Sequence, residues 1–187
     1  MASLAKKILK LPGKFFTKHL LVANISSGIV IGFLGDVMQQ KIKARREAKL
    51  DPGRVDITRA RNLSLTTSLL SVEMHFWYKL LDRVFPKASL KHVAIKVCLD
   101  EMIMAPNFCL SMLAMVNLLE GSSWEKFTSR LKNSFGIMYL ADVVIYTPVQ
   151  CINFYFLPTR YRTVFVYSAS ALYLCIASYA LHDVKGL

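Results

Sequence analysis

The segment that decides the fold is residues 163–181, TVFVYSASALYLCIASYAL, which contains no charged side chain. A helix needs about 20 predominantly apolar residues to cross the hydrocarbon core of a bilayer. This segment of 19 residues is close to that length. It therefore predicts a membrane-spanning helix near the carboxyl end of the chain.

Further apolar runs precede this segment, and a few polar side chains interrupt each of them. They cover residues 20–38, 63–81, 94–119 and 135–157. A soluble amphipathic helix would carry a polar face several residues wide. The pattern predicts an all-α, multi-pass transmembrane helical bundle with four to five spans, and a soluble all-α bundle is the alternative.

The composition excludes two other classes of protein. The chain has 187 residues, of which 54% are apolar and 19% charged, with a formal net charge of +12. Intrinsic disorder requires low hydrophobicity, so it is excluded. The four cysteines form no CxxC pair. This spacing excludes a small disulfide scaffold.

The basic residues are clustered rather than spread evenly. Residues 1–19 hold lysines and no acid, with Leu4, Ile8 and Leu11 at helical spacing. This basic amphipathic segment suits either an organelle-targeting sequence or a helix on the membrane surface. Residues 20–187 are expected to form a single transmembrane helical domain, with a basic connector at 41–61. The basic residues divide evenly between the two sides, so they do not predict orientation.

Polar side chains inside the apolar runs are the candidate functional residues, because such groups are expensive in a bilayer. In residues 135–157 they recur at i, i+4, i+8 and i+11, which places them on one face of a helix. They could line a path for small polar solutes or cations, or form hydrogen bonds between helices. The candidates are Asp36, Gln40, Glu73, His75, Asp100, Glu101, Asp142, Tyr146, Gln150 and Asn153.

Other residues have expected structural roles. Gly28 and Gly32 form a small-xxx-small pair that allows two helices to approach closely. Pro106 and Pro148 are expected to kink their helices. Interface anchors are expected at the end of the second run, where aromatic rings and a lysine suit the lipid headgroup level. These anchors are Trp77, Tyr78 and Lys79.

Four blocks of residues carry a resemblance to a known family. They are GDVMQQ at 35–40, HFWYKLLDRVFP at 75–86, the run from Lys96 through Asp100 to Pro106, and QCINF at 150–154 followed by Pro158 and Arg162. The chain resembles the Mpv-seventeen family, also called the twenty-two-kilodalton peroxisomal membrane protein family, and its second Mpv-seventeen-like branch in particular. It departs from the family pattern at Glu101, at Tyr146–Thr147 and at Tyr173, where the family usually has Gln, Trp-Pro and Trp.

The resemblance implies an integral, multi-pass membrane protein of an organelle, in either the mitochondrial inner membrane or the peroxisomal membrane. The chain lacks a terminal Ser-Lys-Leu address, which favours the mitochondrion. The implied role is a small-solute channel or homeostasis factor that supports mitochondrial genome maintenance and expression. The alternative is a non-conducting membrane scaffold for mitochondrial ribosome assembly and translation.

The expected partners follow from the same features. Besides the lipid bilayer, they are anionic lipids at the basic connector 41–61, a second copy of the chain, and the mitochondrial ribosome. No nucleic-acid module accompanies the basic residues, so sequence-specific nucleic-acid binding is not expected. No nucleotide, metalloprotease or hydrolase motif occurs, and the resemblance implies neither a cofactor nor catalysis. We therefore do not expect an enzyme.

Overall fold

The computed structural model describes residues 19–47, 55–87 and 89–182, and within these ranges the chain is helical and contains no strand. This confirms the all-α prediction. The basic segment expected at 1–19 lies almost entirely outside the described residues. The helices are α2 (Leu20–Glu47), α3 (Ile57–Val84), α4 (Leu90–Leu99), η1 (Asp100–Met104), α5 (Ala105–Leu119), α6 (Trp124–Phe156) and α7 (Thr159–His182).

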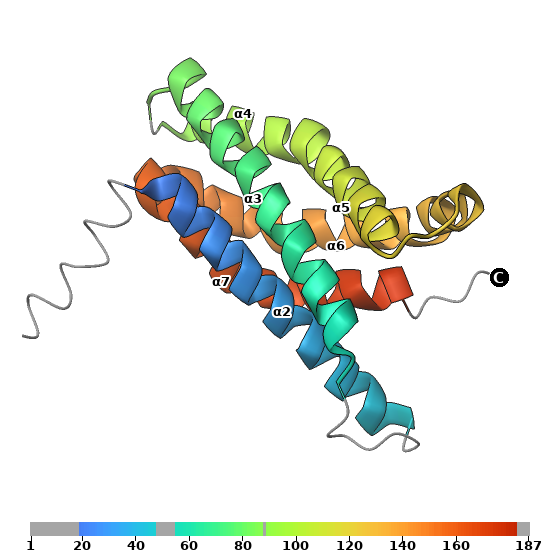
Figure 1. Cartoon of the computed structure of the whole chain (residues 1–187). Helices are drawn as coiled ribbons and strands as arrows, with labels where there is room; N and C mark the ends of the chain where they lie inside the picture. Colours follow the sequence, from blue (N-terminus) through green and yellow to red (C-terminus); the bar gives the residue numbers. More distant parts are fainter. Residues whose placement is uncertain (1–18, 48–54, 88, 183–187) are drawn as a thin grey trace, which may run out of the picture.

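The helices form a bundle in which successive long helices run in opposite directions (Figure 1). Helix α2 packs against α3 and α7, and α7 packs against α6. Helix α6 packs against both α4 and α5, and α3 packs against α5 and α7. The helices therefore close a ring around a common interior.

Local signals in the sequence set the helix ends. The side chains of Asp56, Ser89 and Ser123 cap α3, α4 and α6 by accepting a backbone N–H three residues later. Just after α5, the backbone of Gly121 has a φ of 61°. Glycine adopts this left-handed conformation without strain, so the helix ends there.

The basic connector expected at 41–61 is much shorter than predicted, because α2 continues to Glu47 and α3 begins at Ile57. Alanine, lysine and arginine are good helix formers. These residue types occupy positions 41–46, with one isoleucine, and they extend α2 beyond its apolar run. Much of the expected connector is therefore helix.

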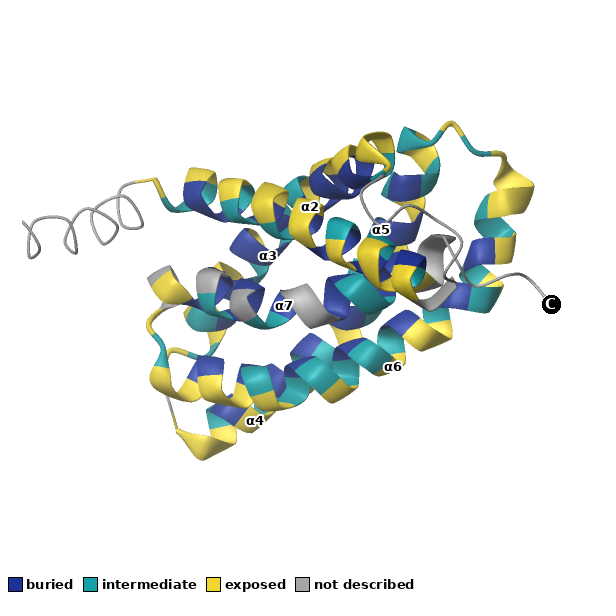
Figure 2. Ribbon diagram, turned by 90° about the horizontal axis from the view of Figure 1, so that it is seen from below, coloured by how far each residue is buried: buried dark blue, intermediate teal, exposed yellow. Residues whose placement is uncertain are grey.

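The distribution of polarity differs from that in a soluble bundle, because the outside is rich in apolar side chains and many polar side chains are buried. Large apolar side chains such as Val30 and Leu140 point outward and are 56% and 65% exposed. Polar side chains such as Asn24, Asp36 and Asn153 are buried in the interior. Figure 2 shows exposed residues along the outward faces of α2 and α4. An apolar exterior around an interior that holds the polar side chains together with an apolar core suits a bundle whose solvent is lipid.

Three described helical stretches are long and apolar enough to cross a membrane, namely Leu20–Arg45, Leu90–Leu119 and Trp124–Phe156. Helix α3 is long enough but carries many polar residues. Several of those residues are buried, and among them Ser64 and Thr66 donate to backbone carbonyls within the helix. Its outward side chains include Leu69 and Phe76. The apolar run 163–181 lies within α7.

The glycine pair of α2 makes the close approach that its spacing predicts. Thr67 Oγ1 of α3 donates to the carbonyl oxygen of Gly28 over 2.7 Å. A Cβ atom at Gly28 would lie 2.7 Å from the Thr67 carbonyl oxygen, and one at Gly32 would lie 3.0 Å from that of Leu63. The backbones of α2 and α3 thus touch where only glycine fits.

Candidate functional site

The polar stripe of α6 faces the interior of the bundle. Asp142, Tyr146, Gln150 and Asn153 are all buried. Tyr146 Oη donates to Ser170 Oγ of α7 over 2.7 Å, and Asn153 Nδ2 donates to Gln150 Oε1 over 2.7 Å. The spacing of these residues on one face of α6 therefore places a row of polar side chains toward the interior of the helix ring.

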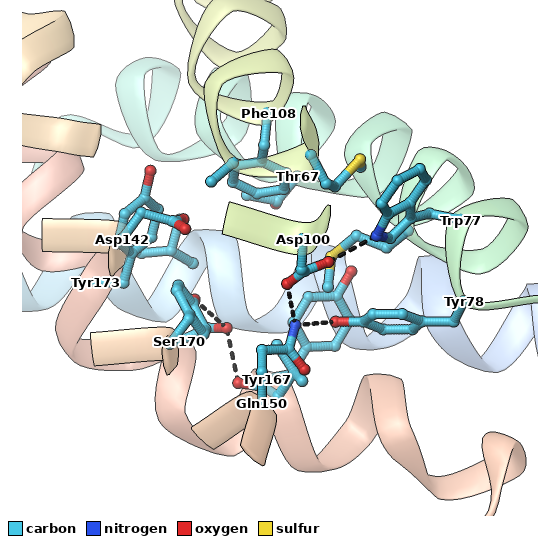
Figure 3. Close-up of a pocket in the computed structure, with 16 residues that line it drawn as sticks. Thr67, Trp77, Tyr78, Asp100, Phe108, Asp142, Gln150, Tyr167, Ser170 and Tyr173 are labelled. Atoms are coloured by element: carbon cyan, nitrogen blue, oxygen red, sulfur yellow. Dashed lines mark hydrogen bonds between the residues drawn. The ribbon is translucent and has the colours of Figure 1, made fainter. Parts of the chain in front are cut away.

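Gln150 connects this wall to two other helices. Its Nε2 donates to Asp100 Oδ2 of η1 over 2.6 Å and to Tyr78 Oη of α3 over 2.8 Å. The indole Nε1 of Trp77 donates to the other oxygen of Asp100 over 2.6 Å. Asp100 is thus held by donors from both α3 and α6, as Figure 3 shows.

The expected roles of Trp77 and Tyr78 as interface anchors are corrected by these contacts. Tyr78 is buried, and the Trp77 indole is directed at an interior carboxylate rather than at lipid headgroups. The physical reason is that a buried carboxylate requires donors, which the polar tips of these rings supply. Lys79, by contrast, is exposed.

The kink expected at Pro106 takes the form of a π-helical turn just before it, over Asp100–Met104. The amide of Ala105 bonds back to the Asp100 carbonyl, five residues earlier. Proline has no N–H to donate, so the regular ladder is interrupted at this point. Both acids of the turn reach α6, since Thr147 Oγ1 donates to Glu101 Oε1 over 3.0 Å. Helix α6 itself continues without interruption through Pro148.

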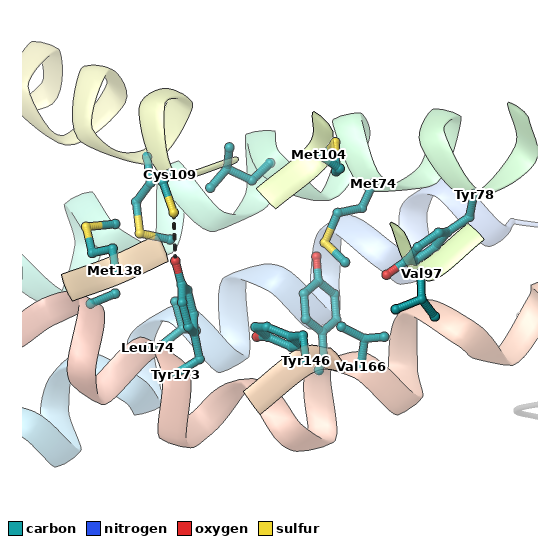
Figure 4. Packing of buried hydrophobic residues seen from close by; sticks show 14 of the residues in the cluster. Met74, Tyr78, Val97, Met104, Cys109, Met138, Tyr146, Val166, Tyr173 and Leu174 are labelled. Atoms are coloured by element: carbon teal, nitrogen blue, oxygen red, sulfur yellow. Dashed lines mark hydrogen bonds between the residues drawn. The ribbon is translucent and has the colours of Figure 1, made fainter. Parts of the chain in front are cut away.

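A small cavity of about 40 Å³ lies between these helices. A water molecule needs roughly 10–15 Å³ of such volume, so the cavity has room for a few waters and no larger solute. Its polar wall includes Asp100, Asp142 and Gln150, and its apolar wall includes Met74 and Val166. Figure 4 shows these apolar side chains packed around Tyr146.

Among the described residues, the ionisable carboxyl groups that line the cavity have no lysine or arginine beside them. Asp100 and Asp142 both line it, and no lysine or arginine does so among the described residues. Asp142 is buried, and the structure gives its carboxylate no hydrogen-bond partner in the described part of the chain. Acids inside membrane bundles commonly mark pathways for ions or protons, and an acid that lacks a partner is the stronger candidate.

Two of the remaining candidates lie away from the cavity. Asn107 Nδ2 of α5 donates to Glu73 Oε2 over 3.1 Å, and Asn24 Nδ2 of α2 donates to His75 Nδ1 over 3.2 Å. Neither Glu73 nor His75 lines the cavity. Both residues hold α3 against a neighbouring helix.

Asp36 and Gln40 share a face, as predicted, but their role is a tertiary one. Gln40 Nε2 donates to Asp36 Oδ2 over 2.6 Å, and Arg59 Nε of α3 donates to Asp36 Oδ1 over 2.8 Å. Ser178 of α7 also donates to this carboxylate. We call these four residues the Asp36 cluster, and it joins α2, α3 and α7 at one end of the bundle.

A second ion cluster, which was not predicted, lies at the opposite end of the bundle. Lys96 Nζ of α4 donates to Asp82 Oδ1 of α3 over 2.7 Å, and Arg162 Nη1 of α7 donates to the same oxygen. Both cations lie over the ring of Phe154, at 5.6 and 5.2 Å from its centroid. We call these four residues the Asp82 cluster. All four residues of the Asp82 cluster lie in the sequence blocks that carry the family resemblance. Those blocks were the only sequence signal that could have indicated the cluster.

Comparison with known proteins agrees with this architecture. A sequence profile described as the Mpv17 / PMP22 family matches residues 117–178, which cover α6 and most of α7. The chain is 29% identical over 149 residues to the mitochondrial inner membrane protein Mpv17 of Xenopus laevis, covering 75% of this chain and 77% of the relative. It is 27% identical over 164 residues to that of Homo sapiens, covering 86% and 89%.

A further relative is PXMP2/4 family protein 4 of Dictyostelium discoideum, 30% identical over 92 residues. That match spans 49% of this chain and 50% of the relative. No solved structure matches the chain.

An apolar exterior, polar side chains buried in the interior and helices long enough to cross a bilayer define a multi-pass α-helical membrane protein. Residues 117–178 match the Mpv17 / PMP22 family, and proteins named Mpv17 are similar to the chain over most of its length. The relatives named Mpv17 are proteins of the mitochondrial inner membrane, and the apolar helices of this chain are compatible with multi-pass insertion.

Proposed function

We propose that the chain is a channel for small polar solutes or cations, and not an enzyme, which supports mitochondrial genome maintenance and expression. The observation that carries this proposal is Asp142, a buried carboxylate that faces an interior cavity with no partner from the described residues. A purely structural carboxylate would be saturated by donors, as Asp36 is.

In this conformation the path is closed, because the cavity holds only a few waters. Three hydrogen bonds join η1 to α6: Gln150 donates to Asp100, Thr147 to the Glu101 carboxylate, and Tyr139 to the Glu101 carbonyl. Opening requires α4 and α5 to move relative to α6, which breaks these contacts. A π-turn followed by Pro106 is a natural hinge, since the regular ladder of backbone hydrogen bonds is already interrupted there.

The test is conductance in planar lipid bilayers. The purified chain should conduct, and Asp142→Leu should reduce cation current by about tenfold or more, because one carboxylate lowers the energy of a nearby cation by at least ~1.4 kcal/mol. Glu125→Gln is the matched control, since Glu125 is exposed at the start of α6. An absence of conductance, or equal currents in both variants, would refute the channel.

The alternative function is a non-conducting scaffold for mitochondrial ribosome assembly and translation. The feature that favours it is the basic extension of α2, where Lys41 and Arg45 are exposed on helix rather than on loop. Such a row attracts RNA phosphates as well as anionic lipids. A scaffold should co-sediment with ribosomal subunits from solubilised mitochondria in a salt-sensitive way, whereas a channel should sediment without them.

A further inference from the structure

The Asp82 cluster contains more positive than negative charge. Lys96 and Arg162 share one carboxylate oxygen of Asp82, and their side chains are only 4% and 7% exposed. A buried charge without a counterion costs several kcal/mol. The two nearly buried cations of the cluster therefore leave one positive charge without a carboxylate of the cluster to balance it.

The helix ends at this end of the bundle add to the positive field. Helices α4 and α7 both begin here, and neither has an acidic residue in its first turn. At the opposite end, α3 is capped by Asp56 and α6 has Glu125 in its first turn. Helix N-termini carry partial positive charge, which acids normally offset. Within the described ranges, α4 and α7 therefore begin without the acid that α3 has at its N-cap and α6 has in its first turn.

We propose that Lys96 and Arg162 form a binding site for a phosphate group, supplied either by the headgroup of an anionic phospholipid or by a phosphorylated solute. Arginine and lysine bind phosphate through charge-assisted hydrogen bonds, and arginine can do so with two N–H groups. Arg162 donates through Nε to the Leu157 carbonyl and through Nη1 to Asp82. Its Nη2 finds no acceptor among the described residues.

The route to the site passes beside Asp82, whose side chain is 21% exposed and so more open than either cation. Lys96 and Arg162 lie next to the ends of the apolar runs 94–119 and 163–181, which is the level of lipid headgroups. An incoming phosphate competes with the Asp82 carboxylate for the same donors. This competition distinguishes a ligand site from a structural ion pair.

The experiment measures the thermal unfolding midpoint of the full chain in two series. The first titrates inorganic phosphate in detergent at constant ionic strength. The second compares phosphatidylcholine vesicles with and without cardiolipin. A ligand that binds the folded chain raises the midpoint. We expect a rise that saturates in wild type, and an apparent affinity about tenfold weaker in Lys96→Gln, since one charge-assisted hydrogen bond is lost.

Lys91→Gln is the matched control, because Lys91 lies exposed on the same helix. Asp82→Asn removes the competing carboxylate and should bind phosphate about tenfold more tightly, which also separates ligand binding from loss of fold. A rise with phosphate in detergent assigns a soluble phosphorylated ligand, and a rise only with cardiolipin assigns a lipid. No saturable rise in wild type, equal effects of Lys96→Gln and Lys91→Gln, or weaker binding by Asp82→Asn would overturn the proposal.

Discussion

Asp36 and Asp142 are both buried aspartates on membrane helices, yet the bundle treats them in opposite ways. Asp36 receives hydrogen bonds from Gln40, Arg59 and Ser178. Asp142 receives none from the described residues and faces a cavity without a cation among them. Asp36 therefore stabilises the fold, whereas Asp142 is retained at a cost in stability. A buried acid that the fold does not satisfy is the better candidate for function.

The largest effect is expected when Asp36, the aspartate that receives hydrogen bonds, is replaced. Asp36→Ala leaves the Arg59 guanidinium without its carboxylate and removes one acceptor that joins three helices. Loss of one partner of a buried ion pair lowers stability by about 3–5 kcal/mol. Unfolding in detergent should show this loss, with the exposed Glu125→Ala as control. A loss no greater than that of the control would mean that the Asp36 cluster does not hold the bundle.

A smaller effect tests whether α2 and α3 are fixed against each other beside the Asp36 cluster. Gly32→Ala places a Cβ 3.0 Å from the Leu63 carbonyl oxygen. The helices must then separate, at a cost of about 1–3 kcal/mol. Gly136 lies in open space within α6. Gly136→Ala should therefore stabilise the protein by about 0.5–1 kcal/mol. Melting curves that shift in the same direction for both variants would contradict the close approach.

The smallest effect concerns the donors of the interior acid Asp100. Trp77→Phe removes the indole N–H that donates to this carboxylate. The loss should destabilise the protein by about 1–2 kcal/mol, because the buried acceptor is left with fewer donors. The control is Trp124→Phe, since Trp124 is largely exposed. That surface change should alter stability by less than about 0.5 kcal/mol.

The same two variants also locate the rings, because the chain has only two tryptophans and each variant leaves one of them. Quenching of fluorescence by a brominated lipid should be strong for Trp124 and weak for Trp77. The reverse order would place Trp77 at the lipid surface as an anchor.

Periodicity and residue size were sufficient to predict the features that lie on one helix. The α6 stripe, the glycine pair and the shared face of Asp36 and Gln40 all follow from 3.6-residue spacing. Features that depend on which helices meet could not be predicted in this way. Arg59 and Ser178 complete the Asp36 cluster from two other helices. The sequence around either residue does not indicate that it contacts Asp36.

The same limit explains the wrong roles for Trp77 and Tyr78. At the end of an apolar run, an aromatic pair followed by a lysine is typical of a lipid interface. Here the interior carboxylate of Asp100, supplied by a different helix, determines the direction of the Trp77 ring. The π-turn was also not predicted, although Pro106 indicated some irregularity close to its position.

The most direct test of the central claim compares Asp36→Asn with Asp142→Asn in the same lipid vesicles. Both changes replace the carboxyl group by an amide and keep the shape of the side chain. The account predicts opposite signs: Asp36→Asn lowers the unfolding midpoint, while Asp142→Asn raises it, by about 1–3 kcal/mol of stability, because an unpaired acid in a membrane is costly. A fall of similar size in both variants would show that Asp142 is another structural acid and would contradict the account.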